Sequence, residues 1–394
     1  LAQAIVATAA SIVVNAAISG QAARLCRQRS PGLRTVLVAS WIALSRRSCF
    51  ATASSFVMTV RHPHLDSTPP AVQDLIRGVL LSKLLLRTTF LQWRVWWCGN
   101  GPRNMSTMER QQMWAMSAPV DAIDIFLSHA WHTPGWTKFV QLSLRANTVL
   151  GIAVGCFVVA ILLTLCHYKA VPVFCEVRSY LAIFDVPNTI DMGMWCAFFG
   201  PPSALLSLLF CPFLLQPSGC DKVLFLDLAC INQVDEDLKA AGIRSLREFL
   251  RSSRELHVMW SPLYFSRLWC VYELAVFLHA NEMGSVRFNP VFMESALLAA
   301  YVLTWAGTLL FMLSLHFPLF GDGIESLNFS YGVLFIPYLI LMHVLRGFMR
   351  QKHALAEQLA AFDVHQAECS DIEDRNFILG RIREWYGCED AFNM

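Results

Sequence analysis

The stretch Arg254–His279, RELHVMWSPLYFSRLWCVYELAVFLH, decides the fold of this chain. A short apolar segment, Leu256–Trp260, leads through a Ser-Pro turn into a helical segment that begins near Ser266. Such a short apolar strand is typical of a parallel sheet that helices cover on both faces. The helical segment carries one carboxylate, Glu273, near its amino-terminal end. We therefore expect Glu273 at the carboxyl edge of the sheet, where open α/β sheets bind ligands.

The composition indicates a membrane protein. Of 394 residues, 55% are hydrophobic and 15% are charged, and the mean hydropathy is +0.46. A soluble domain carries about 25% charged residues. The net charge of +2 conceals a basic first third: residues 1–120 hold 13 Lys or Arg and 3 acids, or 13 − 3 = +10. We predict a lipid bilayer as a partner and no nucleic acid.

The cysteines indicate neither a disulfide framework nor a metal site. Thirteen of them are scattered along the chain, without a CxxC pair or a His/Cys cluster at zinc spacing. Several lie inside apolar runs, where a reduced thiol behaves as a small hydrophobic group. We predict no metal and no cofactor.

Four apolar runs predict about four transmembrane helices, arranged as two hairpins. The first run has about 19 residues without a charge, which is enough to cross the hydrocarbon core. The second run contains Pro201-Pro202, so we expect it to be kinked or partly re-entrant. The runs are Thr148–Cys166, Met192–Leu215, Ser295–Phe317 and Leu327–Leu345.

The charges around the last two runs predict the sidedness. The segment 316–330 between them has no Lys or Arg and contains the sequon Asn328-Phe329-Ser330, whereas Arg346, Arg350 and Lys352 follow the fourth run. The positive-inside rule then places the soluble parts in the cytosol and a glycosylated Asn328 on the opposite side. We predict an integral multi-pass membrane protein.

The soluble blocks supply further strands. Ile123–Leu127 ends in Ser128-His129, Val223–Leu226 ends in Asp227, and Val286–Phe292 follows the opening stretch. Because each hairpin returns the chain to the same side, the blocks can assemble into one parallel α/β sheet. The last block carries FDVHQAEC as a further strand and a capped helix after Asp374. The predicted division is 1–118, 119–146, 147–216, 217–293, 294–346 and 347–394.

The basic region 1–118 receives no function from its sequence. Its Leu- and Trp-rich part, residues 71–98, suits an interfacial helix on anionic lipid. An ordinary amphipathic helix packed on the next domain explains the same pattern.

The soluble blocks, DAIDIFLSHAW (121–131), KVLFLDLACINQ (222–233) and the opening stretch, resemble the TIR (Toll/interleukin-1 receptor) domain, here interrupted by the membrane hairpins. That family shows an S-x-W-C-x-x-E-L helix. Its Ser stands two residues before the Trp, whereas Ser266 here stands three residues before it. The segment 227–233 also resembles the D-x-x-C-I-N-Q box of heterokaryon-incompatibility domains. The residues that match the helix are Ser266, Trp269, Cys270, Glu273 and Leu274.

The resemblance implies a flavodoxin-like sheet and, as in many TIR domains, hydrolysis of NAD at its nicotinamide–ribose bond. The catalytic residue would be Glu273, and NAD would be a substrate rather than a cofactor. Nicotinamide leaves as a neutral group, so one carboxylate that stabilises an oxocarbenium-like centre suffices. The predicted substrate-binding residues are Ser128, His129, Trp131, Asp227 and Trp269.

Structural roles compete with these functional ones. Trp269 at helical spacing suits a core, Asp227 suits a turn, and His129 suits a strand end. Arg254 or Arg267 could pair with Glu273.

Two other functions also remain open. One is a non-catalytic TIR scaffold that forms a homo-oligomer through the loop after Asp227. The other is a channel or transporter with a cytosolic sensor, although the four runs contain no charged residue.

Overall fold

The computed structural model describes residues 56–59, 76–90, 105–172, 176–178, 189–191, 194–210, 221–281, 284–316 and 324–387. The chain divides into two compact units. Unit 1 comprises Leu1–Phe139, Pro217–Met293 and Arg350–Met394, and unit 2 comprises Val140–Gln216 and Glu294–Met349. Most of the region 1–118 lies outside the described residues.

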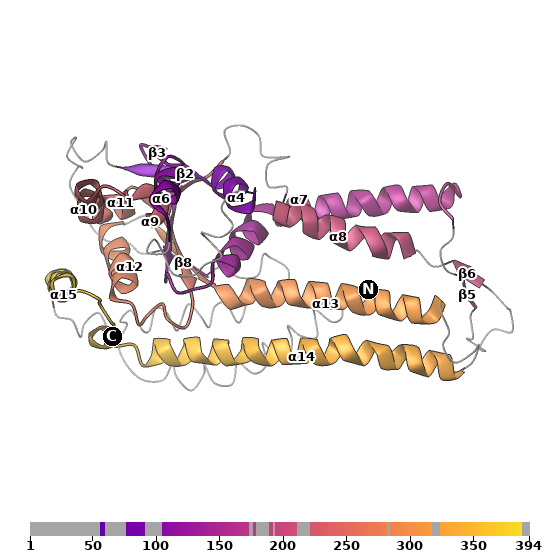
Figure 1. The fold of residues 1–394 in the computed structure, drawn as a ribbon. Helices are drawn as coiled ribbons and strands as arrows, with labels where there is room; N and C mark the ends of the chain where they lie inside the picture. The colour runs from indigo at the N-terminus through magenta and orange to yellow at the C-terminus, as the bar shows by residue number, and fades with distance from the viewer. Residues whose placement is uncertain are drawn as a thin grey trace. The chain divides into compact units, whose positions relative to one another are not determined.

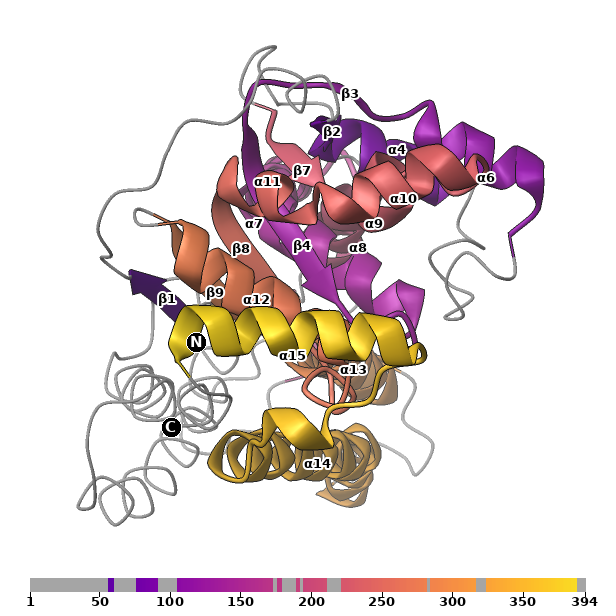
Figure 2. The ribbon, with the colours of Figure 1, turned by 90° about the vertical axis from the view of Figure 1, so that its left-hand side faces the viewer.

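Unit 1 is built on a mixed sheet with the strand order β1-β9-β8-β4-β7-β2, and β3 pairs with β2 beyond it. The four inner strands are parallel, whereas β1 and β2 pair antiparallel at the two sides. Figure 1 shows β2 next to β3, and Figure 2 shows the other strands of this sheet. The predicted α/β class is confirmed, and the prediction of a purely parallel sheet is wrong. The strands are β1 (Phe56–Thr59), β2 (Arg77–Leu80), β3 (Ala118–Pro119), β4 (Ile123–His129), β7 (Val223–Phe225), β8 (Ser253–Trp260) and β9 (Ser285–Pro290).

Helices cover the sheet because their apolar faces meet its aromatic side chains. Phe126 of β4 stacks on Phe225 of β7, with ring centroids 4.3 Å apart, and Phe225 contacts Phe249 of α11 at 4.7 Å. These contacts place α11 on the face of the sheet that Phe126 and Phe225 share. The helices of unit 1 are α4 (Leu81–Phe90), α6 (Thr107–Trp114), α9 (Asp227–Cys230), α10 (Glu236–Arg244), α11 (Leu246–Arg251), α12 (Leu268–Ala280) and α15 (Ile372–Tyr386).

The helix α12 is buried over almost its whole length, as its apolar sequence requires. Its outer side is covered by α15, which lies across it in Figure 2. Tyr272 stacks on Trp385 with centroids 6.0 Å apart, and the Tyr386 hydroxyl donates to the Ala275 carbonyl at 3.1 Å. The carboxyl-terminal helix therefore completes the core around α12.

The segment before α15 secures the start of α12. The predicted strand FDVHQAEC is instead a 3₁₀ turn, Val364–Gln366, followed by a single bridge between Glu368 and Arg267. The Glu368 N–H donates to the Ser266 carbonyl at 2.7 Å, and the Leu268 N–H donates to the Glu368 carbonyl at 3.0 Å. Leu268 begins α12, and the first N–H groups of a helix lack partners within it. The bridge satisfies one of them.

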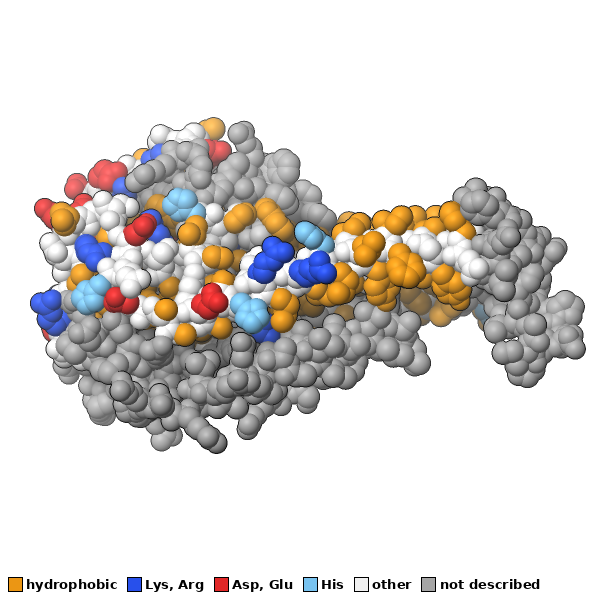
Figure 3. Space-filling view, turned by 90° about the horizontal axis from the view of Figure 1, so that it is seen from below, with side chains coloured by type: hydrophobic (Ala, Val, Ile, Leu, Met, Phe, Trp, Pro, Cys, Tyr) orange, Lys and Arg blue, Asp and Glu red, His pale blue; other side chains and the backbone are white. Residues whose placement is uncertain are grey.

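Unit 2 is helical. Of its described helices, α7, α13 and α14 are long and apolar enough to cross a membrane, which gives three candidate spans where about four were predicted. Figure 3 shows hydrophobic side chains along this part of the chain. The fourth, α8, has 17 residues and contains Pro201 and Pro202. The bounds are α7 (Gly135–His167), which begins in unit 1, α8 (Met194–Phe210), α13 (Val291–His316) and α14 (Ile324–Ala360), with a small hairpin of β5 (Glu176–Arg178) and β6 (Thr189–Asp191).

The prolines of α8 leave a backbone carbonyl without its helical donor, and a neighbouring helix supplies one. Pro201 has no N–H, so the carbonyl of Ala197, four residues earlier, loses its helical donor. The indole N–H of Trp305 in α13 donates to this carbonyl at 2.8 Å. At the other end, the Asn147 side chain of α7 donates to the Leu208 carbonyl at 3.0 Å. In an apolar surrounding each backbone polar group needs such a partner.

A close approach of backbones joins α7 and α8. A Cβ added at Gly155 would lie 2.8 Å from the Cβ of Ala204, which is closer than real Cβ contacts. Small residues at such a contact are typical of helices packed within a bilayer. Gly155 therefore allows α8 to pack closely along α7.

Two predicted boundaries around the hairpins are wrong. The predicted strand to Phe292 ends at Pro290, since α13 already begins at Val291 and so includes Glu294. Glu294 is 2% exposed, and the Gln141 amide of α7 lies 3.4 Å from its carboxylate. Asn328, predicted in a loop, lies exposed within α14.

Candidate functional site

The Glu273 carboxyl meets Ser128 at the carboxyl edge of the parallel strands. Ser128 is the second-last residue of β4, and its hydroxyl donates to Glu273 Oε2 at 2.5 Å. The turn after β8 leads directly into α12, which brings Glu273 to this edge. Ser128 is fully buried, whereas Glu273 is partly exposed. The structure thus brings together the predicted catalytic residue and one predicted substrate-binding residue.

Tyr264 contacts Ser128, and no pattern in the sequence singled it out. Its hydroxyl lies 2.7 Å from Ser128 Oγ and donates to the Cys270 carbonyl at 3.2 Å. The ring is fully buried. A buried tyrosine hydroxyl needs a partner, but only the path of the loop after β8 determines which one. The site therefore contains a chain of three side chains.

Burial raises the pKa of Glu273 to about 8. The hydrogen bond from Ser128 lowers this pKa, and the negative charge of Asp227 raises it. Loss of water around the carboxylate is the largest cause, because a charged group is poorly solvated in an apolar surrounding. The Glu273 carboxyl therefore titrates much closer to neutral pH than an ordinary glutamate does.

A second group lies beside this chain. The Trp131 indole N–H donates to Asp227 Oδ2 at 2.5 Å, and His129 Nε2 lies 3.9 Å from Asp227 Oδ1. Trp131 is 38% exposed, so part of its indole ring is open to solvent. The ends of β4 and β7 thus bring together three predicted substrate-binding residues.

His129 in this group is neutral at physiological pH. Burial lowers its pKa to about 4, the positive charge of Lys138 lowers it further, and Asp227 acts in the opposite direction. The contact between His129 and Asp227 is therefore not an ion pair near pH 7. His129 serves at this edge as an uncharged ring.

Trp269 has structural partners away from Ser128. Its indole N–H donates to Asp374 of α15 at 3.3 Å, and its ring meets Tyr272 edge-on at 5.6 Å. These contacts assign Trp269 to the packing of α15 on α12. Arg254, considered as a partner of Glu273, instead pairs with Asp124 at 3.2 Å.

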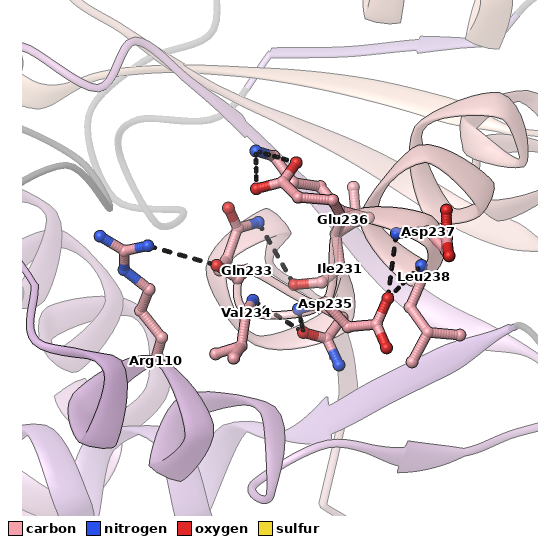
Figure 4. A network of polar contacts seen from close by, with 10 residues as sticks. Arg110, Ile231, Gln233, Val234, Asp235, Glu236, Asp237 and Leu238 are labelled. Atoms are coloured by element: carbon pink, nitrogen blue, oxygen red, sulfur yellow. Dashed lines mark hydrogen bonds and ion pairs between the residues drawn. The ribbon is translucent and has the colours of Figure 1, made fainter.

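The residues after Asp227 stabilise their own loop, as Figure 4 shows. Asn232 Oδ1 accepts the N–H groups of Val234 and Asp235 at 2.8 and 3.0 Å, and the Gln233 amide donates to the Ile231 carbonyl at 3.2 Å. Arg110 of α6 donates to the Gln233 carbonyl at 3.4 Å. Asn232 thus forms an Asx turn that leads the chain into α10.

The described residues contain no group of three or more His, Cys, Asp or Glu side chains placed to hold a metal ion. Burial raises the pKa of the Cys230 thiol to about 12, so this thiol is not a nucleophile. Carboxylate, hydroxyl and indole groups are what this edge offers a ligand. Neither a family model, nor a curated protein, nor a solved structure matches the chain.

Proposed function

We propose that this protein is a membrane-anchored, TIR-like signalling enzyme that hydrolyses NAD at the nicotinamide–ribose bond, with Glu273 as its catalytic residue. One observation carries the proposal. The single carboxylate of the apolar helix α12 is partly exposed and meets Ser128 at the carboxyl end of β4. A group with a strongly raised pKa at such an edge is a candidate for function.

The strand order supports a flavodoxin-like sheet for this proposal. In chain order, the inner strands β7-β4-β8-β9 read 2-1-3-4. The flavodoxin-like order is 2-1-3-4-5, and its ligands bind at the switch point beside the first strand. The first strand here is β4, which ends in Ser128 and His129.

The proposed reaction needs few groups. The C–N bond to the ribose breaks, and nicotinamide leaves with the electron pair as a neutral molecule. Water then adds to the ribose carbon and loses a proton, which yields ADP-ribose. An ionised Glu273 stabilises the positive charge that develops on the ribose. The exposed indole of Trp131, held by Asp227, offers a stacking surface for a ring.

The proposal includes an orientation in the membrane. The spans α7, α13 and α14, with α8 as a fourth, would anchor the enzyme, and the positive-inside rule places unit 1 in the cytosol. Detection of a glycan on Asn328 would support this orientation. Protection of residues 221–281 from protease added to the cytosolic side overturns it.

The two alternative functions differ in what favours them. The scaffold would use the loop after Asp227, but that loop is held by Asn232, Gln233 and Arg110. One observation favours a transporter: Glu294 is buried in the candidate span α13 next to Gln141. Buried ionisable groups in spans are candidates for transport sites.

The test is hydrolysis of NAD by the full-length protein in lipid nanodiscs. It covers a range of protein concentrations, because the resemblance to TIR domains implies a homo-oligomer formed through the TIR-like domain. Nicotinamide and ADP-ribose are quantified by chromatography. We expect release by the wild-type protein and a loss of about 10²-fold or more for Glu273→Gln. Glu236→Gln is the matched control, since Glu236 is exposed on α10 and pairs with Lys239.

Intact NAD at the highest protein concentration would contradict the enzyme. Undiminished hydrolysis by Glu273→Gln would contradict the site.

A further inference from the structure

The Glu273 carboxyl is one end of a continuous hydrogen-bond chain. It runs from Glu273 Oε2 to Ser128 Oγ over 2.5 Å, to the Tyr264 hydroxyl over 2.7 Å, and to the Cys270 carbonyl over 3.2 Å. Ser128 and Tyr264 are both fully buried. Their protons therefore have few acceptors other than the members of this chain.

The protons of this hydrogen-bond chain can be arranged in two ways, because each hydroxyl is both a donor and an acceptor. With Glu273 protonated, the carboxyl donates to Ser128, Ser128 donates to Tyr264, and Tyr264 donates to the Cys270 carbonyl. With Glu273 ionised, Tyr264 donates to Ser128, and Ser128 donates to the carboxylate. Loss of the Glu273 proton to solvent, together with rotation of the two hydroxyl groups, converts the first arrangement into the second. Both protonation states of Glu273 are thus hydrogen-bonded without movement of the backbone.

We propose that Ser128 and Tyr264 are positioning residues that let Glu273 remain neutral in the empty site and lose its proton when a positively charged ring binds beside it. That the ring is the pyridinium of NAD rests on the proposed function. The two-state chain itself rests on the geometry of β4, α12 and the loop between β8 and α12.

The surroundings of Glu273 favour the neutral form until a cation arrives. Asp227 is negative, and burial raises the pKa values of Tyr264 and Cys270, so both stay neutral. His129 is neutral beside Asp227. Two positive charges among the described residues also act on this group: Lys138 acts on His129 and Cys270, and Arg267 acts on Cys270. A bound cation would lower the pKa of Glu273 by the same Coulomb effect through which Asp227 raises it.

The first test observes the carboxyl directly, by infrared titration of the full-length protein in nanodiscs. We expect a protonated-carboxyl band at pH 7 that is absent in Glu273→Gln and that disappears with a midpoint at about 8. Tyr264→Phe keeps the ring but removes the donor to Ser128 in the ionised state. We expect it to move the midpoint upward by about 0.5 to 1 pH unit, and Ser128→Ala to move it further.

Absence of this band at pH 7 would overturn the proposed two-state hydrogen-bond chain. A midpoint unchanged in both Tyr264→Phe and Ser128→Ala would do the same, provided that both variants melt like the wild-type protein.

The second test uses 1-methylnicotinamide, a pyridinium ion without a ribose, as a probe that cannot be hydrolysed at a glycosidic bond. Calorimetry in two buffers of different ionisation enthalpy measures the protons released on binding. We expect close to one proton at pH 7 for the wild-type protein and none for Glu273→Gln. The dissociation constant should rise about tenfold for each pH unit below the midpoint, because the proton competes with the cation.

No binding, or binding without proton release, would overturn the coupling to a cation. Absence of NAD hydrolysis together with the expected infrared midpoints would refute the proposed function but not the two-state hydrogen-bond chain.

Discussion

Two glutamates at opposite ends of β8 show what the same side chain becomes in two surroundings. Glu255, in the amino-terminal half of β8, accepts from His257 Nε2 at 2.8 Å and from Arg287 of β9 at 2.6 Å. The hydrogen bond with His257 is the main reason that the pKa of Glu255 falls to about 2. Glu273, beyond the carboxyl end of β8, accepts from the neutral Ser128 hydroxyl, and burial raises its pKa to about 8.

The difference separates a structural charge from a reactive one. Glu255 remains ionised because its carboxylate is hydrogen-bonded to nitrogens of His257 on β8 and Arg287 on β9. Glu273 has a proton that leaves within the physiological pH range. In enzymes, surroundings that give two side chains of the same kind such different pKa values are typical of acid–base sites. Each experiment below alters one side of this contrast.

The largest effect is expected for Glu273→Gln at alkaline pH. Between the ordinary pKa of 4.5 and about 8, the folded protein holds a proton that the unfolded chain has lost, so the stability of the wild-type protein falls as pH rises. At about 1.4 kcal/mol per pKa unit, the upper limit is about 5 kcal/mol. Melting temperatures are measured in nanodiscs from pH 4 to 9. We expect the melting temperature of the variant to rise relative to that of the wild-type protein as pH rises. Parallel profiles would show that Glu273 is already ionised.

The next effect is expected for Arg287→Gln, which leaves Glu255 without its cation. Hydrogen bonds to charged groups contribute about 1.5 to 3 kcal/mol, so we expect the free energy of unfolding at pH 7 to fall by about 2 kcal/mol. Arg254→Gln is the matched control, because the Arg254 side chain is 74% exposed in its pair with Asp124. Exposed pairs contribute less than about 1 kcal/mol. Equal losses in the two variants would remove the distinction.

The smallest effect is expected for His257→Asn, which removes the main cause of the low pKa of Glu255. The stability that Glu255 contributes is present above pH 4.5 and is lost as pH falls towards 2. With a pKa closer to its ordinary value, the variant gains less from Glu255 and unfolds at a higher pH, with a loss of about 1 kcal/mol at pH 7. An acid titration followed by circular dichroism measures this midpoint. An unchanged midpoint would assign the low pKa to Arg287 instead.

Local patterns predicted the strands that carry the candidate site. The apolar segments before Ser128 and Asp227 set the ends of β4 and β7 within two residues, since a short apolar run between polar residues specifies a buried strand. The helix with Glu273 was predicted in the same way.

What the sequence did not predict depends on contacts between distant segments. The sheet is mixed because β1 and β2, each four residues long, pair antiparallel with β9 and β7 from a region without a clear strand pattern. Tyr264 reaches Ser128 through the path of a loop. Trp269 shares the helix of Glu273, but the docking of α15 provides its partner. None of these partners is visible in the residues next to it.

The indole of Trp305 on the carbonyl of Ala197 has a consequence for biosynthesis. The ribosome completes α8 before it makes α13, so the Ala197 carbonyl of the new chain at first lacks this donor. The carbonyl gains its partner only when α13 packs against α8, so α8 reaches its final hydrogen bonding after a later part of the chain has been made.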